Sequence, residues 1–175
     1  YSLVRSHFAY KAKLRKEALK EEVNSTVSKL RKATDTREAL ALFREHSREE
    51  LQSDLDFTAE VFGKAVNGFM NENLRELRKV LTAVEEKKIH LKQVKRVGTL
   101  GVTQLDHDIA VEKGLYYYQG NDFASEIIFS IRRLAEPMKD HIDNNFSPLS
   151  PVQKDDFGKV SEQIISPLRN CATMI

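Results

Sequence analysis

The sequence is poor in residues that break helices or cross-link a chain. Among its 175 residues there are seven glycines, four prolines, one cysteine and no tryptophan. The single Cys171 excludes an internal disulfide and a zinc site built from several cysteines, and it favours a reducing compartment. With 41 % hydrophobic and 31 % charged residues, the composition is typical of a helical protein with charged faces. It disfavours a β-sandwich and a disordered chain.

Long apolar runs and a strong charge of one sign are also absent. No stretch approaches the roughly 18 apolar residues that a membrane span requires, and no signal peptide is visible. The net charge of +2 gives no general attraction to nucleic acid, so we expect no nucleic-acid partner. Because the chain starts at Tyr1 and not at a methionine, we expect it to be a piece of a larger protein.

Apolar residues spaced three and four apart predict a series of long helices. A first helix is indicated by Leu19, Val23, Val27 and Leu30. After a turn and helix N-cap in "TDTRE" at 34–38, a second helix from about 37 to 70 is indicated by Leu51, Leu55, Thr58, Phe62, Ala65 and Phe69. A third, with a bend or break at its two late glycines, is indicated by Leu74, Leu77, Leu81, Val84, Leu91 and Val94.

Two more helices are predicted in the C-terminal half. One starts near 116–118 or just after Gly120, with the stripe Phe123, Ile127, Ile131, Leu134, Met138 and Ile142. The other starts at Pro151, where proline is tolerated in a first turn, with the stripe Phe157, Val160, Ile164, Leu168 and Cys171. The stripe predicts that Cys171 is a buried structural residue. Since no convincing strand is visible, we predict an all-α fold, an up-and-down antiparallel bundle of four to five long helices.

Charge is unevenly distributed along the chain. Six Lys or Arg face one acid, Glu17, in residues 1–20. This bias predicts a basic N-terminal helix over 1–35 that lies close to an anionic membrane surface, ahead of a bundle domain over 36–175. The alternative is an ordinary charged helix. A second basic run, "KKIHLKQVKR" at 87–96, reads as a solvated helix face, or as a surface for an anionic partner.

The residue pattern does not favour an enzyme. The histidines are scattered, and none follows a glutamate by three residues, as di-iron bundles require: His7, His46, His90, His107 and His141. "GTLG" at 98–101 lacks the lysine and the strand context of a phosphate-binding loop. A metal-dependent hydrolase on a helical bundle is therefore the least favoured alternative.

Clustered acids give the one candidate binding site. On a helix, Glu136, Asp140 and Asp143 fall within about 60° of one another, away from the predicted core. Like charges four residues apart destabilise a helix, and a proline at 137 removes a backbone hydrogen bond, so neither is expected for solubility alone. The alternative is a helix end at which Asp143 and Asn144 satisfy the last turn.

A second acidic pair has the same spacing. Glu50 and Asp54 lie four residues apart on the predicted second helix. Carboxylates from two helices could supply the oxygen ligands of a divalent metal ion. The sequence thus predicts a candidate cation site formed by Glu50, Asp54, Glu136, Asp140 and Asp143.

Residues 112–151, "EKGLYYYQGNDFASEIIFSIRRLAEPMKDHIDNNFSPLSP", resemble a segment of bacterial inorganic phosphate transporters of the PiT class. The most specific words are "EP" at 136–137 and "HIDNNFSPL" at 141–149, and residues 40–110 are compatible with the same family. Some of these transporters carry a cytoplasmic helical domain similar to PhoU, a regulator of phosphate uptake. Two features depart from PhoU: the tandem three-helix repeat is not visible, and a proline lies inside the second acidic pair.

The resemblance implies a PhoU-like helix bundle with a regulatory or structural function and no catalysis. It implies a location at the cytoplasmic face of the inner membrane, with the membrane-spanning part of the parent transporter as partner. The Glu50/Asp54 and Glu136/Asp140 pairs match in form the metal-cluster motifs of that family, and a homo-oligomer is compatible with it. The alternative is a stand-alone helical interaction protein that has no link to transport.

Overall fold

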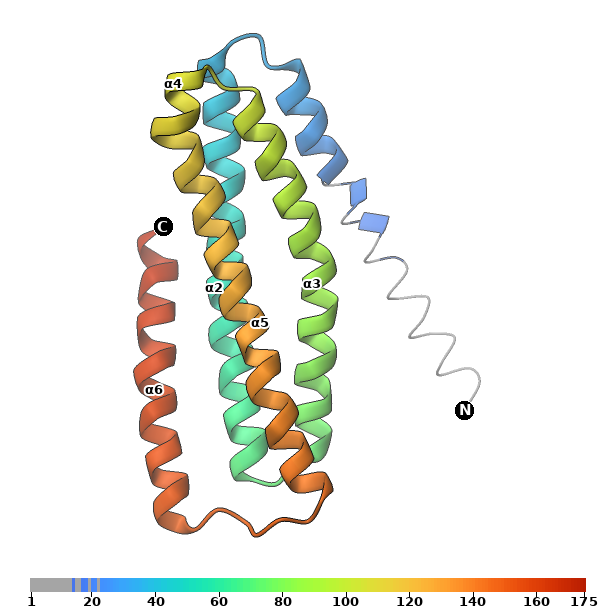
Figure 1. The fold of residues 1–175 in the computed structure, drawn as a ribbon, viewed down its shortest axis with the longest axis vertical. Coiled ribbons are helices and arrows are strands. Elements are labelled where there is room, and N and C mark those ends of the chain that lie inside the picture. The colour runs from blue at the N-terminus through green and yellow to red at the C-terminus, as the bar shows by residue number, and fades with distance from the viewer. Residues whose placement is uncertain (1–13, 15–16, 19, 22) are drawn as a thin grey trace.

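The computed structural model describes residues 14, 17, 18, 20, 21 and 23–175, and these are almost entirely helical. Residues 23–32 form a helix that precedes the bundle (Figure 1). The long helices are α2 (Thr36–Met70), α3 (Leu74–Thr103), α5 (Leu115–Asp143) and α6 (Pro151–Met174). The short α4 (His107–Ile109) and the π-helical η1 (Ala110–Gly114) lead into α5. No strand occurs among the described residues, so the predicted all-α bundle is confirmed.

Helix starts follow the local sequence signals. The side chain of Asp35 accepts a hydrogen bond of 2.8 Å from the backbone N–H of Glu38 and so caps α2. At α6, the hydroxyl of Ser150 accepts from the N–H of Gln153 at 3.3 Å, and the Gln153 side chain accepts from the N–H of Ser150 at 2.9 Å. This capping box places Pro151 in the first turn, as the sequence predicts.

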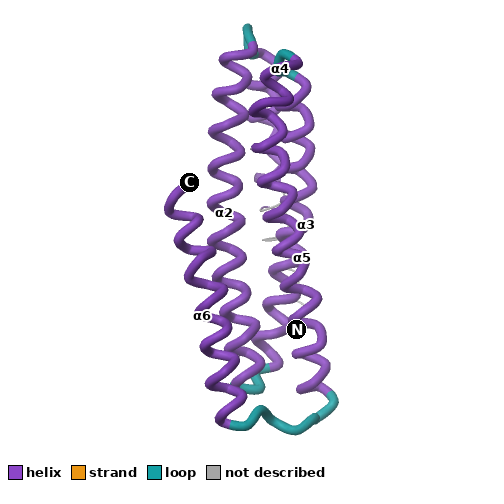
Figure 2. Tube along the Cα trace, turned by 60° about the vertical axis from the view of Figure 1, so that its left-hand side comes forward, coloured by secondary structure: helices purple, strands orange, loops and turns teal. Residues whose placement is uncertain are grey.

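The four long helices alternate in direction, and α2 lies at the centre (Figures 1 and 2). Helices α3 and α5 pack on each other and on α2, whereas α6 packs extensively only on α2. Figure 2 shows α6 standing to one side of the other three helices. Within the described residues, no helix combines the length and the apolarity that a membrane span requires.

Two clusters of buried side chains form the core. The larger one joins α2, α3 and α5, with residues such as Phe62, Leu77 and Ile131, and includes Ile165 of α6. The smaller one lies near the α4 end and includes Leu30, Phe43 and Val97. Helix α3 continues through Gly98 and Gly101 and ends at Thr103, so it does not break at the two glycines. A Cβ on Gly101 would lie 2.5 Å from Cδ2 of Phe43, and the glycine is therefore needed for this close packing.

The predicted core stripe of α5 is wrong at three of its six positions. Phe123, Ile127 and Leu134 are 67 %, 42 % and 47 % exposed, whereas Ile131 is buried and Met138 and Ile142 are half-buried. The residue that follows each of the three exposed ones is buried instead: Ala124, Ile128 and Ala135. Alanines at two of these positions allow the close helix contacts that a phenylalanine or leucine would prevent.

In α6 the buried stripe is likewise shifted by one residue from the predicted stripe. Val160 and Ile164 are 54 % and 42 % exposed, and Cys171 is exposed, so its predicted burial is wrong. The following residues are buried against α2: Ser161, Ile165 and Ala172. Both helices thus carry two adjoining stripes, and the one with small residues makes the contact. The larger side chains of the other stripe remain at the surface.

Candidate functional site

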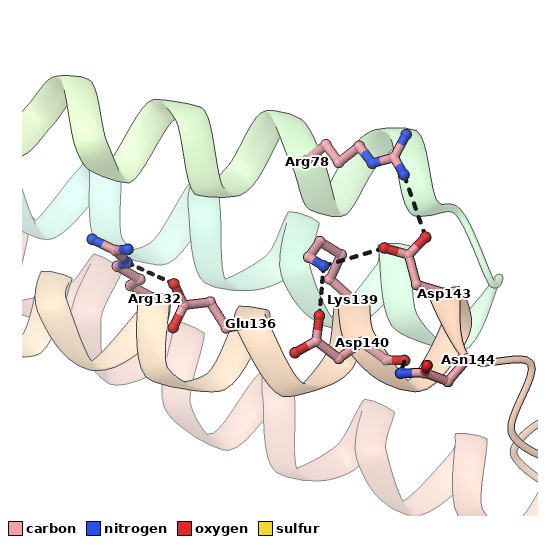
Figure 3. A network of polar contacts seen from close by, with 7 residues as sticks. All are labelled: Arg78, Arg132, Glu136, Lys139, Asp140, Asp143 and Asn144. Atoms are coloured by element: carbon pink, nitrogen blue, oxygen red, sulfur yellow. Dashed lines mark hydrogen bonds and ion pairs between the residues drawn. The ribbon is translucent and has the colours of Figure 1, made fainter.

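The acids at the end of α5 are paired with basic side chains. Glu136 accepts a hydrogen bond of 2.8 Å from Nε of Arg132, one turn earlier (Figure 3). Arg132 also donates to Glu85 of α3 at 2.9 Å. The bond to Glu136 and the charge of both acids raise the pKa of the Arg132 guanidinium. Helix α5 continues through Pro137, and the acids lie on its outer side, away from the buried residues.

Asp140 and Asp143 share one cation. The Nζ atom of Lys139 lies 2.5 Å from a carboxylate oxygen of Asp140 and 3.2 Å from one of Asp143. These hydrogen bonds raise the pKa of Lys139. Asp143 also accepts from Arg78 of α3 at 3.3 Å, so this end of α5 is tied to its neighbour (Figure 3).

The same turn has the features of a helix end. The side-chain amide of Asn144 donates a 2.7 Å hydrogen bond to the carbonyl of Asp140, and its backbone N–H donates to the same oxygen at 3.0 Å. Asn145 adopts a left-handed backbone conformation with a φ of 53°, which asparagine tolerates better than most residues. Asn144 therefore satisfies the last turn, as the helix-end alternative requires.

The second acidic pair lies inside the bundle. Glu50 is 8 % exposed and Asp54 is fully buried. An oxygen of Glu50 lies 2.6 Å from Nε2 of His90, and Oδ1 of Asp54 lies 2.6 Å from Nζ of Lys87. Two ionisable pairs thus connect α2 to α3. The prediction of a solvated face for residues 87–96 is wrong at its first and fourth positions, because these two side chains point into the bundle.

The pKa values of the two buried carboxyl groups are shifted in opposite directions. Burial raises the pKa of Asp54, and the attraction of Lys87 offsets only part of this effect. Burial also acts to raise the pKa of Glu50, but the hydrogen bond and charge of His90, together with the charges of His46 and Lys87, outweigh it, and the pKa is lowered. A fully buried charge is costly unless it is paired, so these contacts fix which residues of α2 and α3 face each other.

The five predicted acids do not form one site. Arg78, which contacts Asp143, and Lys87, which contacts Asp54, lie nine residues apart on α3, which corresponds to about 14 Å along the helix. Among the described residues, no three His, Cys, Asp or Glu side chains come together as a metal ion would require. A metal site at either pair stays a prediction, and each carboxylate already has a basic partner that a metal would have to displace.

An apolar groove between α5 and α6 is the feature that the sequence reading missed. Its volume is about 390 Å³, and α2 forms its floor. The lining is almost entirely apolar and includes Leu51, Leu55, Phe123, Ile127, Cys171 and Met174. The available signal was the presence of two adjoining apolar stripes on each of these helices, only one of which can face α2.

No protein-family model, no curated protein and no solved structure matches this chain. The candidate functional surface is therefore defined by the structure alone: an apolar groove between two helices, and acidic pairs that are engaged with basic side chains.

Proposed function

We propose that this chain is a helical interaction domain that regulates an inorganic phosphate transporter from the cytoplasmic face of the inner membrane. The observation that carries the proposal is the unpartnered apolar surface of α5 and α6, with Phe123, Ile127 and Ile164 exposed. An apolar patch of this kind is typical of a surface that binds another protein. Its α5 half lies within residues 112–151, the segment that resembles PiT-class transporters.

In this proposal, the acidic end of α5 has a structural role. Two ion pairs hold α5 against α3, one between Arg78 and Asp143 and one between Glu85 and Arg132. Lys139 pairs with Asp140 and Asp143 within α5. These contacts position α5 as a support for the apolar surface. A regulatory bundle needs such a support because a partner can only be held in one orientation by a surface of fixed shape.

The proposal is tested in the intact parent protein. Uptake of radiolabelled phosphate is measured in cells at low and high external phosphate, for the wild type and for Ile127→Glu with Ile164→Glu. We expect the double variant to lose the dependence of uptake on phosphate supply, because charges in the groove prevent docking. The matched control is Glu162→Gln, an exposed change on α6 outside the apolar stripe. Unchanged regulation in the double variant and after deletion of the domain would exclude the proposal.

A stand-alone interaction protein is the second candidate, and the same apolar surface favours it. The coding sequence beside this chain distinguishes the two candidate functions. A domain of a transporter requires several apolar spans in the same polypeptide, and a stand-alone protein does not. If no such spans are present, the groove remains a docking surface and the link to phosphate uptake is lost.

A further inference from the structure

The exposed apolar residues of α5 and α6 form two regular stripes. The α5 stripe consists of Phe123, Ile127 and Leu134, and the α6 stripe consists of Phe157, Val160, Ile164 and Met174. Within each stripe the spacings are three, four, seven or ten residues, which place all members on one side of a helix. On each helix, this exposed stripe lies next to the stripe that packs on α2.

The two stripes face a common groove. Near the C-terminus of α6, Phe123 and Ile127 line the groove together with Cys171 and Met174. Leu134 follows Ile127 by seven residues and Ile164 precedes Cys171 by seven, so both lie on the sides of their helices that face the groove.

Beyond the groove, Phe69 of α2 packs against both helices. Its ring lies 5.3 Å from that of His141 of α5 and 5.7 Å from that of Phe157 of α6, measured between ring centroids. The groove itself lies at the C-terminal end of α6. The two exposed stripes continue beyond it along both helices, and together they are long enough to pair with another helix.

The size of this surface is that of a protein interface. The seven side chains expose on the order of 700 Å², more than the roughly 300–600 Å² of the largest apolar patch on a typical monomer. A standard protein interface buries about 800 Å² on each partner. One helix packed along both stripes would therefore cover an area close to that of a stable complex.

The α6 stripe has the properties of the helix that would fill such a groove. Its heptad positions are Phe157, Val160, Ile164, Pro167, Cys171 and Met174, and none of them is charged. The charged residues of α6 lie elsewhere on the helix: Lys154, Asp155, Asp156, Lys159, Glu162 and Arg169. An apolar groove discriminates against buried unpaired charge, and the α6 stripe meets that requirement.

We propose that the chain forms a symmetric dimer in which α6 of each copy lies antiparallel to α6 of the other, in the groove between α5 and α6. The arrangement is reciprocal, because each copy supplies both a groove and the helix that fills it, as a two-fold interface requires. The axis passes between the position of Ile164 and that of Pro167. In this dimer the second copy occupies the apolar surface that carries the proposed function, so the two proposals differ in the partner they place there. The association itself does not depend on the link to phosphate transport.

The antiparallel arrangement fixes which residues meet. Position 157 lies opposite 174 of the second copy, 160 opposite 171, and 164 opposite 167. Val160 is thus next to the exposed thiol of Cys171 in the other copy. Within one copy these two positions are eleven residues apart, roughly 17 Å along the helix, so no disulfide can join them in the same chain.

Disulfide cross-linking tests this register. We expect Val160→Cys, oxidised by copper phenanthroline, to form a covalent dimer through the native Cys171. The matched controls are the wild type and Val160→Cys with Cys171→Ser, in which the like cysteines lie roughly 17 Å apart along the helices and stay reduced. Cross-linking of the wild type through Cys171 alone would show a parallel arrangement and overturn the proposal.

Light scattering of the purified chain tests the association itself. We expect a molar mass twice the 20.1 kDa of one chain. Ile127→Glu with Ile164→Glu should give a monomer that keeps the helical circular dichroism of the wild type, and Glu162→Gln should remain a dimer. A monomeric wild type at about 100 µM, far above the micromolar Kd of a weak interface, would overturn the proposal and leave the groove to a different partner.

Discussion

Asp54 of α2 is fully buried, and its carboxylate lies 2.6 Å from Nζ of Lys87 of α3. Lys87 also lies over the ring of Phe57, 5.7 Å from its centroid, so its stem and charge are enclosed by α2. Removal of one member of such a pair leaves an uncompensated buried charge. Replacement of both members by apolar residues does not.

The first prediction concerns this pair. Lys87→Met should lower the free energy of unfolding by about 3–5 kcal/mol, because it leaves Asp54 buried and unpaired. Asp54→Leu with Lys87→Met should recover most of that loss. The measurement is a urea titration of each variant. The exposed pair of Arg132 and Glu136 serves as the control, since Arg132→Ala should cost about 1 kcal/mol or less.

The second prediction concerns the response to acid. The pKa of Glu50 is lower in the folded protein than its ordinary value of 4.5. Burial acts to raise it, but the hydrogen bond to His90 and the charges of His90, His46 and Lys87 together outweigh burial. A carboxyl group with a lowered folded pKa stabilises the fold above its unfolded pKa, and this contribution is lost as pH falls through the folded pKa. The difference in unfolding free energy between wild type and Glu50→Gln should therefore be largest near neutral pH and should shrink below pH 4.5.

The pKa of Asp54 is shifted in the opposite direction to that of Glu50, so the two acids can be compared within one protein. Burial raises its pKa above 3.8, so its own titration favours the folded state at low pH and opposes it as pH rises through the folded pKa. The two acids thus partly cancel in the wild type. Urea titrations across pH 3–7 should show a steeper acid loss in Asp54→Asn than in Glu50→Gln. Equal pH profiles in both variants would contradict the assigned contacts.

The third prediction uses two glycines as a matched pair. Gly101→Ala places a Cβ 2.5 Å from Phe43 and should lower the free energy of unfolding by about 1–3 kcal/mol through overpacking. Gly158→Ala in α6 meets nothing within 4 Å and should raise it by up to about 1 kcal/mol, through helix propensity alone. Thermal melts of both variants decide this, and destabilisation by Gly158→Ala would show that α6 packs differently.

The sequence predicts the number, the class and most boundaries of the helices, because capping residues and apolar spacing are local properties. Asp35 and Ser150 mark helix starts that the structure shows. Which face of α5 and α6 is buried is not a local property of the sequence. Phe123 and Ala124 begin adjoining stripes, and the choice between them depends on how closely α2 approaches.

The charged residues show the same limit. Lys87 and His90 look like members of a basic surface run, and only the position of α2 shows that Asp54 and Glu50 face them. The sequence alone therefore does not show whether an acidic pair four residues apart is buried or exposed. One such pair is buried against another helix, and the other lies exposed beside Lys139.

The fourth prediction concerns the basic N-terminal segment, of which residues 1–13, 15, 16, 19 and 22 lie outside the described part of the chain. Binding to liposomes should require anionic lipid and weaken with salt, because juxtamembrane Lys and Arg are attracted to a negative surface. Replacement of Lys11, Lys13, Arg15 and Lys16 by glutamine should reduce co-sedimentation. Equal binding to neutral liposomes would contradict the prediction.

The fifth prediction concerns the acids at the end of α5. A divalent cation at Asp140 and Asp143 must compete with Lys139, whose Nζ already contacts both carboxylates. Mn²⁺ or Mg²⁺ should therefore raise the melting temperature of Lys139→Gln more than that of the wild type, since a ligand selective for the folded state stabilises it. Asp140→Asn should abolish the rise in either background.

Asp54→Asn shows whether a metal response belongs to this site. Asp54 lies inside the bundle beside Lys87 and far along α3 from Arg78, so its replacement should leave the response at Asp140 unchanged. A response that survives Asp140→Asn but not Asp54→Asn would place the cation between α2 and α3. No metal response in any variant would leave the helix-end interpretation, in which Asn144 caps the last turn and the neighbouring acids serve Arg78 and Lys139.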